Sequence, residues 1–461
     1  MISRRDLFRL GAIGGAGTLL TGCAEVSRRL SPEVGAAKVP TGSVEPELRL
    51  ANRLAFGPSG NDLVELRELG REAWIRRELA ANRPYDVRLQ LQLRRTAAIH
   101  YEAGELRDLP ETEVLRHLQQ ATVLRAVYSP NQLHERMVDF WSNHFNLNGK
   151  KWPVAYSLPL DARRVVRENA LGRFEDLLMA SAKSPAMLQY LDNQVNKKGI
   201  PNENYAREIM ELHTLGVDGG YTQRDVMEVA RCFTGWGIEN GFLKRRGAFK
   251  FDADYHDGGS KVVLGQRIAA GGGLSDGERV VALLARHPST ARFLARKACD
   301  YFLGHAPEAL VAKMAKRYLA DDTSVRALLE PLLFSDALDE APPVFKRPLD
   351  YVVSAIRVTG AQTDGGPAVL EQLRRMGQPL YEWPMPDGYP VETPAWTGGM
   401  LARWNFAIGL TSAKPPGTTI VNADAAQRAI AAVVPDLAAS VAANPAQVTR
   451  LGLMSPAFQW K

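Results

Sequence analysis

Two carboxylates on one predicted helix are the strongest candidates for chemistry in this chain. Residues 202–216 are predicted to form this helix, because Asn202 suits an N-terminal cap and Gly216 suits the stop. At about 100° per residue, Glu208 falls inside the apolar face and Glu211 flanks it one turn later. An unpaired buried carboxylate is costly, so we expect a cation, a donor network or a metal beside Glu208.

A histidine on a second predicted helix is the expected partner of these carboxylates. His144 follows Phe140 by four positions and so shares the apolar face of its own helix. Carboxylate and imidazole ligands suit a divalent metal, whose bound water could act as a nucleophile with a carboxylate as general base. The sequence thus predicts a catalytic and metal site of Glu208, Glu211 and His144. The alternative is a buried hydrogen-bonded pair of His144 and Glu208 that fixes helix register.

Other polar residues are expected either to support this site or to lie apart from it. His213 follows Glu208 by five positions and points to the opposite edge of the apolar face, so it does not join the site. Residues 134–138 resemble an HExxH zinc motif but have Val138 in place of the second histidine. The supporting residues are expected to be Asn143, Asn204, Arg207, His256 and Asp257.

The first residues of the chain predict export. Arg4 and Arg5 precede a short apolar stretch, as in a twin-arginine signal, and the small residues before Cys23 resemble a lipoprotein cleavage box. We therefore expect a signal peptide over residues 1–22 and a lipid-anchored tether over residues 23–44. The protein is expected to be a periplasmic, membrane-anchored lipoprotein, and the absence of aspartate after Cys23 favours the outer membrane.

Composition limits the remaining possibilities. No segment after the signal is long enough to span a bilayer, so the body is expected to be soluble. The net charge of the 461-residue chain is +6 with scattered arginines, which gives no argument for nucleic-acid binding. Cys232 and Cys299 are interpreted as buried thiols, although an exported protein could also form a disulfide between them.

Helical periodicity dominates the rest of the sequence, which predicts a mainly α protein with one large helical domain over residues 45–461. A small β-hairpin is expected as an insertion at about residues 245–268, with residues 249–252 pairing with 261–264 across a turn at 256–259. Residues 376–396, rich in proline and aromatic side chains, cannot form a regular helix. This segment, the strap, is expected to cover the helical core or to form a cleft wall.

Several segments together resemble a bacterial family known as domain of unknown function 1800. The strongest likeness lies in the segments NENYARE (202–208), HTLGV (213–217), YT (221–222) and ARCFTGW (230–236). Further similar segments are residues 53–58, FWSNHF at 140–145, 256–257, 287–291, 376–379 and 455–459. The resemblance implies an exported, mostly helical envelope protein without an assigned reaction.

The chain differs from the family pattern at two positions, and the resemblance also implies a partner protein. Ser142 stands where relatives often have a second histidine, which removes a possible ligand next to His144. Many relatives have phenylalanine at the position of His213, which makes this histidine a poor candidate for catalysis. Genes of the family often lie beside those of another exported family, domain of unknown function 1501, which resembles sulfatases and phosphatases.

Two classes of function therefore follow from the sequence. The first is a metal-dependent envelope enzyme that uses Glu208, Glu211 and His144. The alternative is a non-catalytic helical partner or scaffold for a neighbouring exported sulfatase- or phosphatase-like protein. Binding of a glycan or a peptide by the aromatic side chains between Trp383 and Trp396 is a third possibility.

Overall fold

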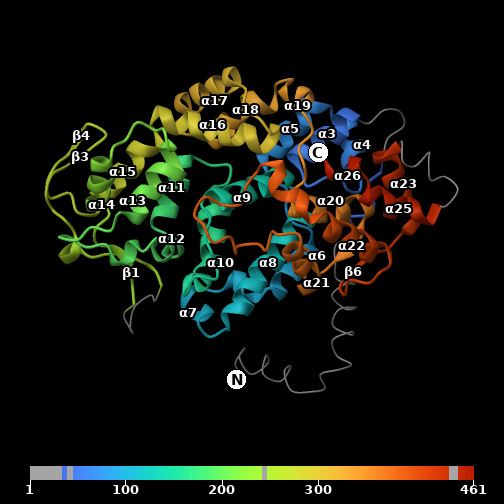
Figure 1. The fold of residues 1–461 in the computed structure, drawn as a ribbon, viewed down its shortest axis with the longest axis horizontal. Helices are drawn as coiled ribbons and strands as arrows, with labels where there is room; N and C mark the ends of the chain where they lie inside the picture. The colour runs from blue at the N-terminus through green and yellow to red at the C-terminus, as the bar shows by residue number, and fades with distance from the viewer. Residues whose placement is uncertain (1–33, 39–44, 241–246, 436–444) are drawn as a thin grey trace.

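Helices make up most of the computed structural model, which describes residues 34–38, 45–240, 247–435 and 445–461 (Figure 1). Strands in this part of the chain form three two-stranded sheets. The prediction of a mainly α fold is confirmed. Arg4, Arg5 and Cys23, with the predicted signal peptide, lie outside the described residues. No helix within the described residues is both long enough and apolar enough to cross a membrane.

The first part of the chain contains helices of very different length. They are α3 (Glu45–Leu54), α4 (Asp62–Leu69), α5 (Arg71–Ala80), α6 (Val87–Arg95), α7 (Ala103–Leu106), α8 (Glu111–Tyr128), α9 (Gln132–His144), α10 (Leu158–Leu160), α11 (Phe174–Ala182), α12 (Pro185–Tyr190), α13 (Glu203–Met210) and α14 (Gln223–Cys232). Two π-helices, η3 (Asp161–Arg167) and η5 (Glu211–Leu215), extend α10 and α13. The 3-10 helices of this part are η1 (Ala97–His100), η2 (Val154–Tyr156) and η4 (Asn193–Val195).

The second part combines longer helices with the short strands. Its helices are α15 (Leu274–Ala285), α16 (Pro288–Leu303), α17 (Glu308–Ala320), α18 (Val325–Leu333), α19 (Ala337–Glu340), α20 (Pro348–Thr359), α21 (Pro367–Arg375), α22 (Met400–Thr411), α23 (Ala423–Val433), α25 (Pro445–Met454) and α26 (Pro456–Gln459), with the 3-10 helices η6 (Ala253–Tyr255) and η7 (Thr393–Gly399). The strands are β1 (Trp236–Ile238), β2 (Phe249–Phe251), β3 (Lys261–Val263), β4 (Gln266–Ile268), β5 (Ala361–Thr363) and β6 (Thr418–Ile420).

The helix α9 occupies a central position, and one continuous hydrophobic core extends from Ala37 to Phe458 around it. In Figure 1 the green helices α11 to α14 lie on one side of α9 and the orange and red helices α20 to α26 lie on the other. The orange strap crosses the face of α9 and α8. Most of its residues are irregular, as its prolines predict, and a 3-10 helix begins only at Thr393. The fold therefore places α9 between the core and the strap.

The predicted β insertion is present, but its strand pairing was wrong. β2 pairs antiparallel with β1, and β3 pairs with β4, so residues 249–252 do not pair with 261–264. The reason lies in the two-residue turn between β3 and β4. Leu264 and Gly265 have φ values of 49° and 76°, and two consecutive residues with positive φ close a tight hairpin. Part of the segment between β1 and β2, residues 241–246, lies outside the described residues.

The two remaining cysteines are buried and unpaired. Burial raises the pKa of both Cys232 and Cys299 to about 12, so neither thiol is ionised near neutral pH. The interpretation of both as buried thiols, and not as a disulfide, is confirmed.

Candidate functional site

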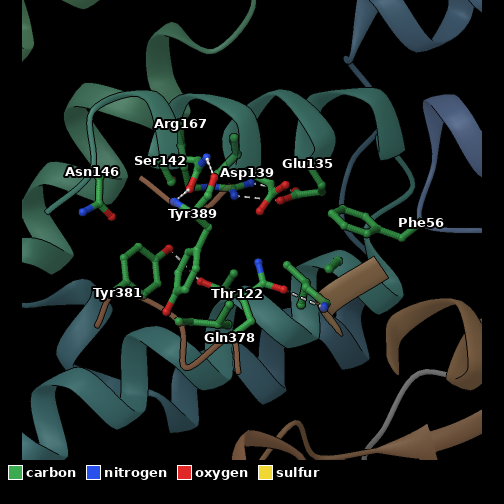
Figure 2. A pocket seen from close by; sticks show the side chains of 15 residues that line it. Phe56, Thr122, Glu135, Asp139, Ser142, Asn146, Arg167, Gln378, Tyr381 and Tyr389 are labelled. Atoms are coloured by element: carbon green, nitrogen blue, oxygen red, sulfur yellow. Dashed lines mark hydrogen bonds and ion pairs between the residues drawn. The ribbon is translucent and has the colours of Figure 1, made fainter. Parts of the chain in front are cut away.

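Two faces of α9 have opposite chemical character. Apolar side chains such as Phe140 and Trp141 pack into the core together with His144. The other face carries Glu135 and Asp139, which border a cavity beneath the strap (Figure 2). Because successive positions on a helix differ by about 100°, positions four apart such as 135 and 139 share a face. The cavity is therefore built on the polar side of the helix that carries the predicted histidine.

The cavity is narrow and lies between α9, α8 and the strap. Its volume of about 50 Å³ is room for a few water molecules. The residues that line it are Phe56, Thr122, Ala126, Glu135, Val138, Asp139, Ser142, Asn143, Asn146, Arg167, Leu349, Gln378, Leu380, Tyr381 and Tyr389.

A buried ion pair forms one end of the lining. Arg167 donates from Nη1 to Glu135 Oε2 at 2.8 Å and from Nη2 to Glu135 Oε1 at 2.7 Å. The hydroxyl of Tyr85 also donates to Oε1, at 3.1 Å. Although burial opposes the charge, Arg167 holds the pKa of Glu135 well below its usual range. Glu135 is therefore ionised and its charge is neutralised within the protein.

Asp139 is held on one of its two oxygens. Its Oδ2 accepts a hydrogen bond from the Tyr301 hydroxyl at 2.7 Å and a further one from the Arg347 guanidinium. Its Oδ1 has no hydrogen-bond partner within the described residues, and the residue belongs to the cavity lining. The carboxylate is thus fixed in orientation while one oxygen stays free to accept from a bound molecule.

Two further residues with polar groups line the same cavity, Gln378 of the strap and Ser142 of α9. Gln378 is fixed because its Oε1 accepts from the backbone N–H of Leu349 at 2.9 Å. Its Nε2 makes no hydrogen bond within the described residues and points toward α9 in Figure 2. The hydroxyl of Ser142 also has no hydrogen-bond partner within the described chain and belongs to the same lining. A carboxylate acceptor, an amide donor and a hydroxyl therefore converge on one small space.

The strap forms the roof of the cavity and is bonded to α9. Asn143 accepts from the backbone N–H of Tyr389 at 2.8 Å and donates to the carbonyl of the same residue at 2.9 Å. Asn146 donates to the carbonyl of Trp383 at 3.1 Å. Tyr381 adds a bond between its hydroxyl and that of Thr122, at 2.9 Å. Asn143, expected to support the metal site, thus holds the roof of a different site.

His144 lies on the apolar side of α9, inside an aromatic shell. Its ring centroid lies 4.6 to 6.3 Å from those of five neighbouring aromatic residues, Phe140, Trp141, Phe145, Phe174 and Phe293. Nε2 lies 3.0 Å from the carbonyl oxygen of His213 and so carries the proton, while the buried Nδ1 has no partner within the described residues. Burial lowers the pKa of His144 well below its usual range, and nearby Lys297 adds to this. His144 is therefore neutral.

The two predicted carboxylates lie together, but apart from His144. Burial and the neighbouring Glu211 raise the pKa of Glu208, with Asp387 of the strap adding negative charge. The hydroxyl of Tyr221 donates to Glu211 Oε2 at 3.2 Å. No hydrogen bond or ion pair joins His144 to Glu208 within the described residues. The carboxylates are thus half-buried beside the strap, and the structure does not form the alternative His144–Glu208 pair.

The π-helix η5 changes the helical register before His213. A π-helix has more residues per turn than an α-helix, so the α-helical wheel no longer applies after Met210. In this segment His213 and Thr214 are buried, while Leu212 is half-buried. Burial lowers the pKa of His213 to about 3. The sequence contains no signal for this change of register.

The remaining supporting residues serve local structure. Asn204 donates to the Leu191 carbonyl at 3.2 Å, and Arg207 bonds to Glu203 at 3.1 Å. The other two lie in the β insertion. There, His256 Nε2 lies 3.2 Å from a carboxylate oxygen of Asp276, and Asp257 accepts from Arg231 at 2.7 Å. None of these four side chains bonds to Glu208 or Glu211 in the described part of the chain.

Sequence reasoning missed the polar face of α9. Glu135 was considered only as part of a failed HExxH motif, although its spacing to Asp139 was a usable signal. Arg167 and Gln378 reach the cavity from η3 and the strap, and no local pattern connects them with α9. In the described residues, no group of three or more His, Cys, Asp or Glu side chains is placed to hold a metal ion. The metal site of Glu208, Glu211 and His144 therefore stays a prediction.

Comparison with known proteins gives one match. A family model described as "Protein of unknown function (DUF1800)" matches residues 49–460. No curated protein and no solved structure gives a significant match. The match covers every residue of the cavity lining, and it supplies no reaction for them.

Proposed function

We propose that this chain, which belongs to the DUF1800 family of proteins of unknown function, binds a neutral, hydroxyl-bearing molecule such as a sugar in the cavity beneath the strap. The observation that carries the proposal is that three residues of one lining each keep a polar atom without a hydrogen-bond partner in the described part of the chain, namely Asp139 Oδ1, Ser142 Oγ and Gln378 Nε2. They offer an acceptor, a donor and a group that can be either, which are the partners a hydroxyl needs.

The charges around the cavity favour a neutral ligand. Glu135 is paired with Arg167, and Asp139 accepts from Arg347, so the charged side chains of the lining already neutralise one another. An ionic ligand would have to disrupt one of these buried pairs, and an unpaired buried charge is costly. A ligand that brings only hydroxyl or amide groups leaves both pairs intact.

The aromatic roof adds a surface for stacking. Tyr381 and Tyr389 line the cavity, and the ring of Tyr389 lies 4.9 Å from that of Trp383. The apolar faces of sugar rings stack on aromatic side chains of this kind. Because the volume is about 50 Å³, we propose that a terminal sugar enters only when the strap moves away from α9.

Calorimetric titration of the purified protein tests the proposal. The probes are glucose, N-acetylglucosamine, cellobiose and chitobiose. We expect at least one of them to bind, with affinity reduced about 3- to 10-fold in Ser142→Ala, since one hydrogen bond contributes about 0.5–1.5 kcal/mol. Ser142→Phe should abolish binding, because the larger ring fills the cavity.

The matched control is Ser260→Ala, which removes an exposed serine hydroxyl away from the cavity lining. It should bind the sugar as the parent does. Thermal unfolding of each variant establishes that it folds. The proposal fails if no probe binds the parent, or if Ser142→Phe folds and binds as tightly as the parent.

We also propose that the protein acts in the cell envelope as an exported lipoprotein. The proposal rests on Arg4, Arg5 and Cys23 in the sequence. Replacing both arginines with lysine should leave the chain in the cytoplasm, and Cys23→Ser should release the exported protein from the membrane fraction. Unchanged export or unchanged membrane association, respectively, would contradict each part.

The metal-dependent enzyme and the sulfatase- or phosphatase-like partner remain hypotheses of the sequence. The carboxylates Glu208 and Glu211 are not joined by His144, so the cavity has the stronger geometric support. Elemental analysis of the exported protein decides the first hypothesis. One equivalent of a transition metal in the parent, and none in Glu208→Ala, would support the metal-dependent enzyme that uses these carboxylates.

A further inference from the structure

The two most exposed large apolar side chains of the described residues lie in two loops near α12. Ile200 exposes 86% of its surface and Trp152 exposes 74%. Single exposed apolar residues are common on protein surfaces, so exposure alone indicates nothing about binding. A binding role for these two side chains therefore needs support from a second, independent feature of the same loops.

That second feature is the charge carried by the same loops. Residues 148–153 and residues 193–200 each contain two adjacent lysines and no acidic residue. In both loops the lysine pair stands just before the exposed apolar side chain, with Lys150 and Lys151 before Trp152 and with Lys197 and Lys198 before Ile200. The two segments differ in their ion pairs, because Lys150 Nζ lies 3.8 Å from Glu382 and Lys151 Nζ lies 3.0 Å from Asp192. Both segments therefore present an apolar tip, and the charges to consider, unpaired within the described residues, are those of Lys197 and Lys198.

The two loops are tied to each other. Lys151 Nζ donates to the carbonyl of Tyr190 at 2.6 Å and lies 3.0 Å from both carboxylate oxygens of Asp192. Asp192 immediately precedes η4, where the second loop begins. The side chain of Lys151 therefore fixes the first loop against the start of the second.

The second loop is also fixed at its tip. Lys197 and Ile200 form an antiparallel bridge, and the N–H of Lys198 donates to the carbonyl of Tyr255 at 2.8 Å. The Lys197 ammonium lies 4.3 Å from the centre of the exposed Tyr255 ring. Neither Lys197 nor Lys198 forms an ion pair within the described residues. Their charges are therefore free to meet an anionic surface.

We propose that these two loops, the basic edge, bind the surface of an anionic phospholipid bilayer. Lysines attract acidic headgroups, and tryptophan is enriched at the boundary between headgroups and acyl chains. A protein partner would need a continuous complementary surface of about 800 Å² on each side. The basic edge instead offers two separate apolar tips together with the charges of Lys197 and Lys198, which suits shallow insertion into a bilayer.

The basic edge would orient the protein on a membrane. Its binding does not depend on the cavity or on any sugar, since it uses none of the residues that line the cavity. A lipid anchor alone sets only the distance of a protein from the bilayer. A second contact that joins charge and apolar insertion also selects the face that is turned toward the membrane.

Sedimentation with lipid vesicles tests the proposal on the full chain carrying Cys23→Ser, which has no lipid anchor. Vesicles of phosphatidylcholine mixed with phosphatidylglycerol should bind the protein, and vesicles of phosphatidylcholine alone should bind it much less. Each lysine near an anionic surface contributes about fivefold, so Lys197→Gln with Lys198→Gln should weaken binding about 25-fold. Trp152→Ser with Ile200→Ser should weaken it tenfold or more.

The matched control is Leu401→Ser with Val421→Ser in the same background. These side chains are 68% and 60% exposed and lie on α22 and after β6, outside the basic edge. Because every variant keeps the same amino-terminal residues, any binding by that segment is common to all of them. The control should bind as the parent does, and unchanged thermal unfolding establishes that each variant folds.

Three results would overturn the proposal. The parent could fail to bind acidic vesicles, which would favour an acidic protein as the partner of these lysines. It could bind neutral and acidic vesicles equally, which would remove the role of the lysines. Finally, the Trp152 and Ile200 variant could bind as tightly as the Leu401 and Val421 control, which would remove the role of the apolar tips.

Discussion

The helix α9 borders two buried regions in which polar side chains have different partners. On one side His144 lies among aromatic rings, and its one hydrogen bond to the described part of the chain is to the carbonyl of His213. On the other side Glu135 bonds to the Arg167 guanidinium and Asp139 accepts from the Arg347 guanidinium. The apolar side keeps its histidine neutral, whereas the polar side pairs its acidic side chains with arginines.

This difference decides which side can act on a ligand. A neutral imidazole enclosed by aromatic rings has no access to a bound molecule. Asp139 and Gln378 are held by hydrogen bonds to other groups, and together with Ser142 they line a cavity. Burial therefore does not by itself mark a functional residue, and an unsatisfied atom that faces an empty space is the better indicator.

The largest effect should come from removing a charge on the polar side. Asp350, at the start of α20, accepts from Arg136 of α9 and from Lys461 Nζ at 2.9 Å. Asp350→Ala leaves both cations buried without this partner and should lower the free energy of unfolding by about 3–5 kcal/mol. Urea unfolding measures the change. The exposed Glu340→Ala should stay within about 0.5 kcal/mol of the parent, and an equal loss in both variants would contradict the prediction.

The apolar side should respond to pH. Burial lowers the pKa of His213 to about 3 and that of His144 well below its usual value. The folded protein then keeps both neutral, while the unfolded chain takes up a proton on each below about pH 6.5. Stability should be complete above about pH 6.5 and should fall by about 1.4 kcal/mol per pH unit for each histidine as the pH decreases toward 5.

The variant His144→Phe isolates one of these contributions. Its unfolding free energy should depend less on pH than that of the parent, by about 2 kcal/mol between pH 6.5 and 5. If His144 were instead paired with a carboxylate such as Glu208, its pKa would be raised and the parent would gain stability as the pH fell. A steeper loss of stability in the variant than in the parent would therefore contradict the neutral histidine.

The contact between α9 and the strap should be sensitive to one glycine. Gly388 has a φ of 81°, and a Cβ there would lie 2.3 Å from the carbonyl oxygen of Asn143. Gly388→Ala should cost about 1–3 kcal/mol and increase hydrogen exchange at the Tyr389 amide, which donates to Asn143. Gly258→Ala, where no atom lies within 4 Å of the added Cβ, is the control. Equal exchange in both variants would show that Gly388 does not hold the roof.

The smallest effect on stability should come from Ser142→Ala. The serine hydroxyl has no partner within the described residues, so its loss should change the unfolding free energy by less than about 0.5 kcal/mol. Urea unfolding checks this value. A loss above about 1.5 kcal/mol would show that the hydroxyl is a structural group, and it would weaken the case for an open binding position on the polar side.

Local patterns predicted those parts of the molecule that depend on neighbouring residues. Asn202 caps α13 as expected, with its side chain accepting from the N–H of Asn204, and Thr222 caps α14. The prolines of the strap prevented a helix, as predicted. These features follow from hydrogen bonding and sterics within a few residues, so the sequence contains the information directly.

The candidate site depended on information that no local pattern contains. The spacing of His144 correctly placed it on an apolar face, but only packing shows that the face is aromatic and makes no contact with Glu208. The π-helix η5 changes the register of the helix, and His213 is buried within it. Arg167 and Gln378 join α9 from far along the chain, so their role could not be read from spacing.

The bonds between Asn143 and Tyr389 join residues that are 246 positions apart. During synthesis, a chain that ends before the strap already contains α9, but the cavity has no roof. The polar side of the helix stays open to water until the last part of the chain has folded against it. Closure of the cavity is therefore a late event in folding, since distant contacts form only after the intervening chain is ordered.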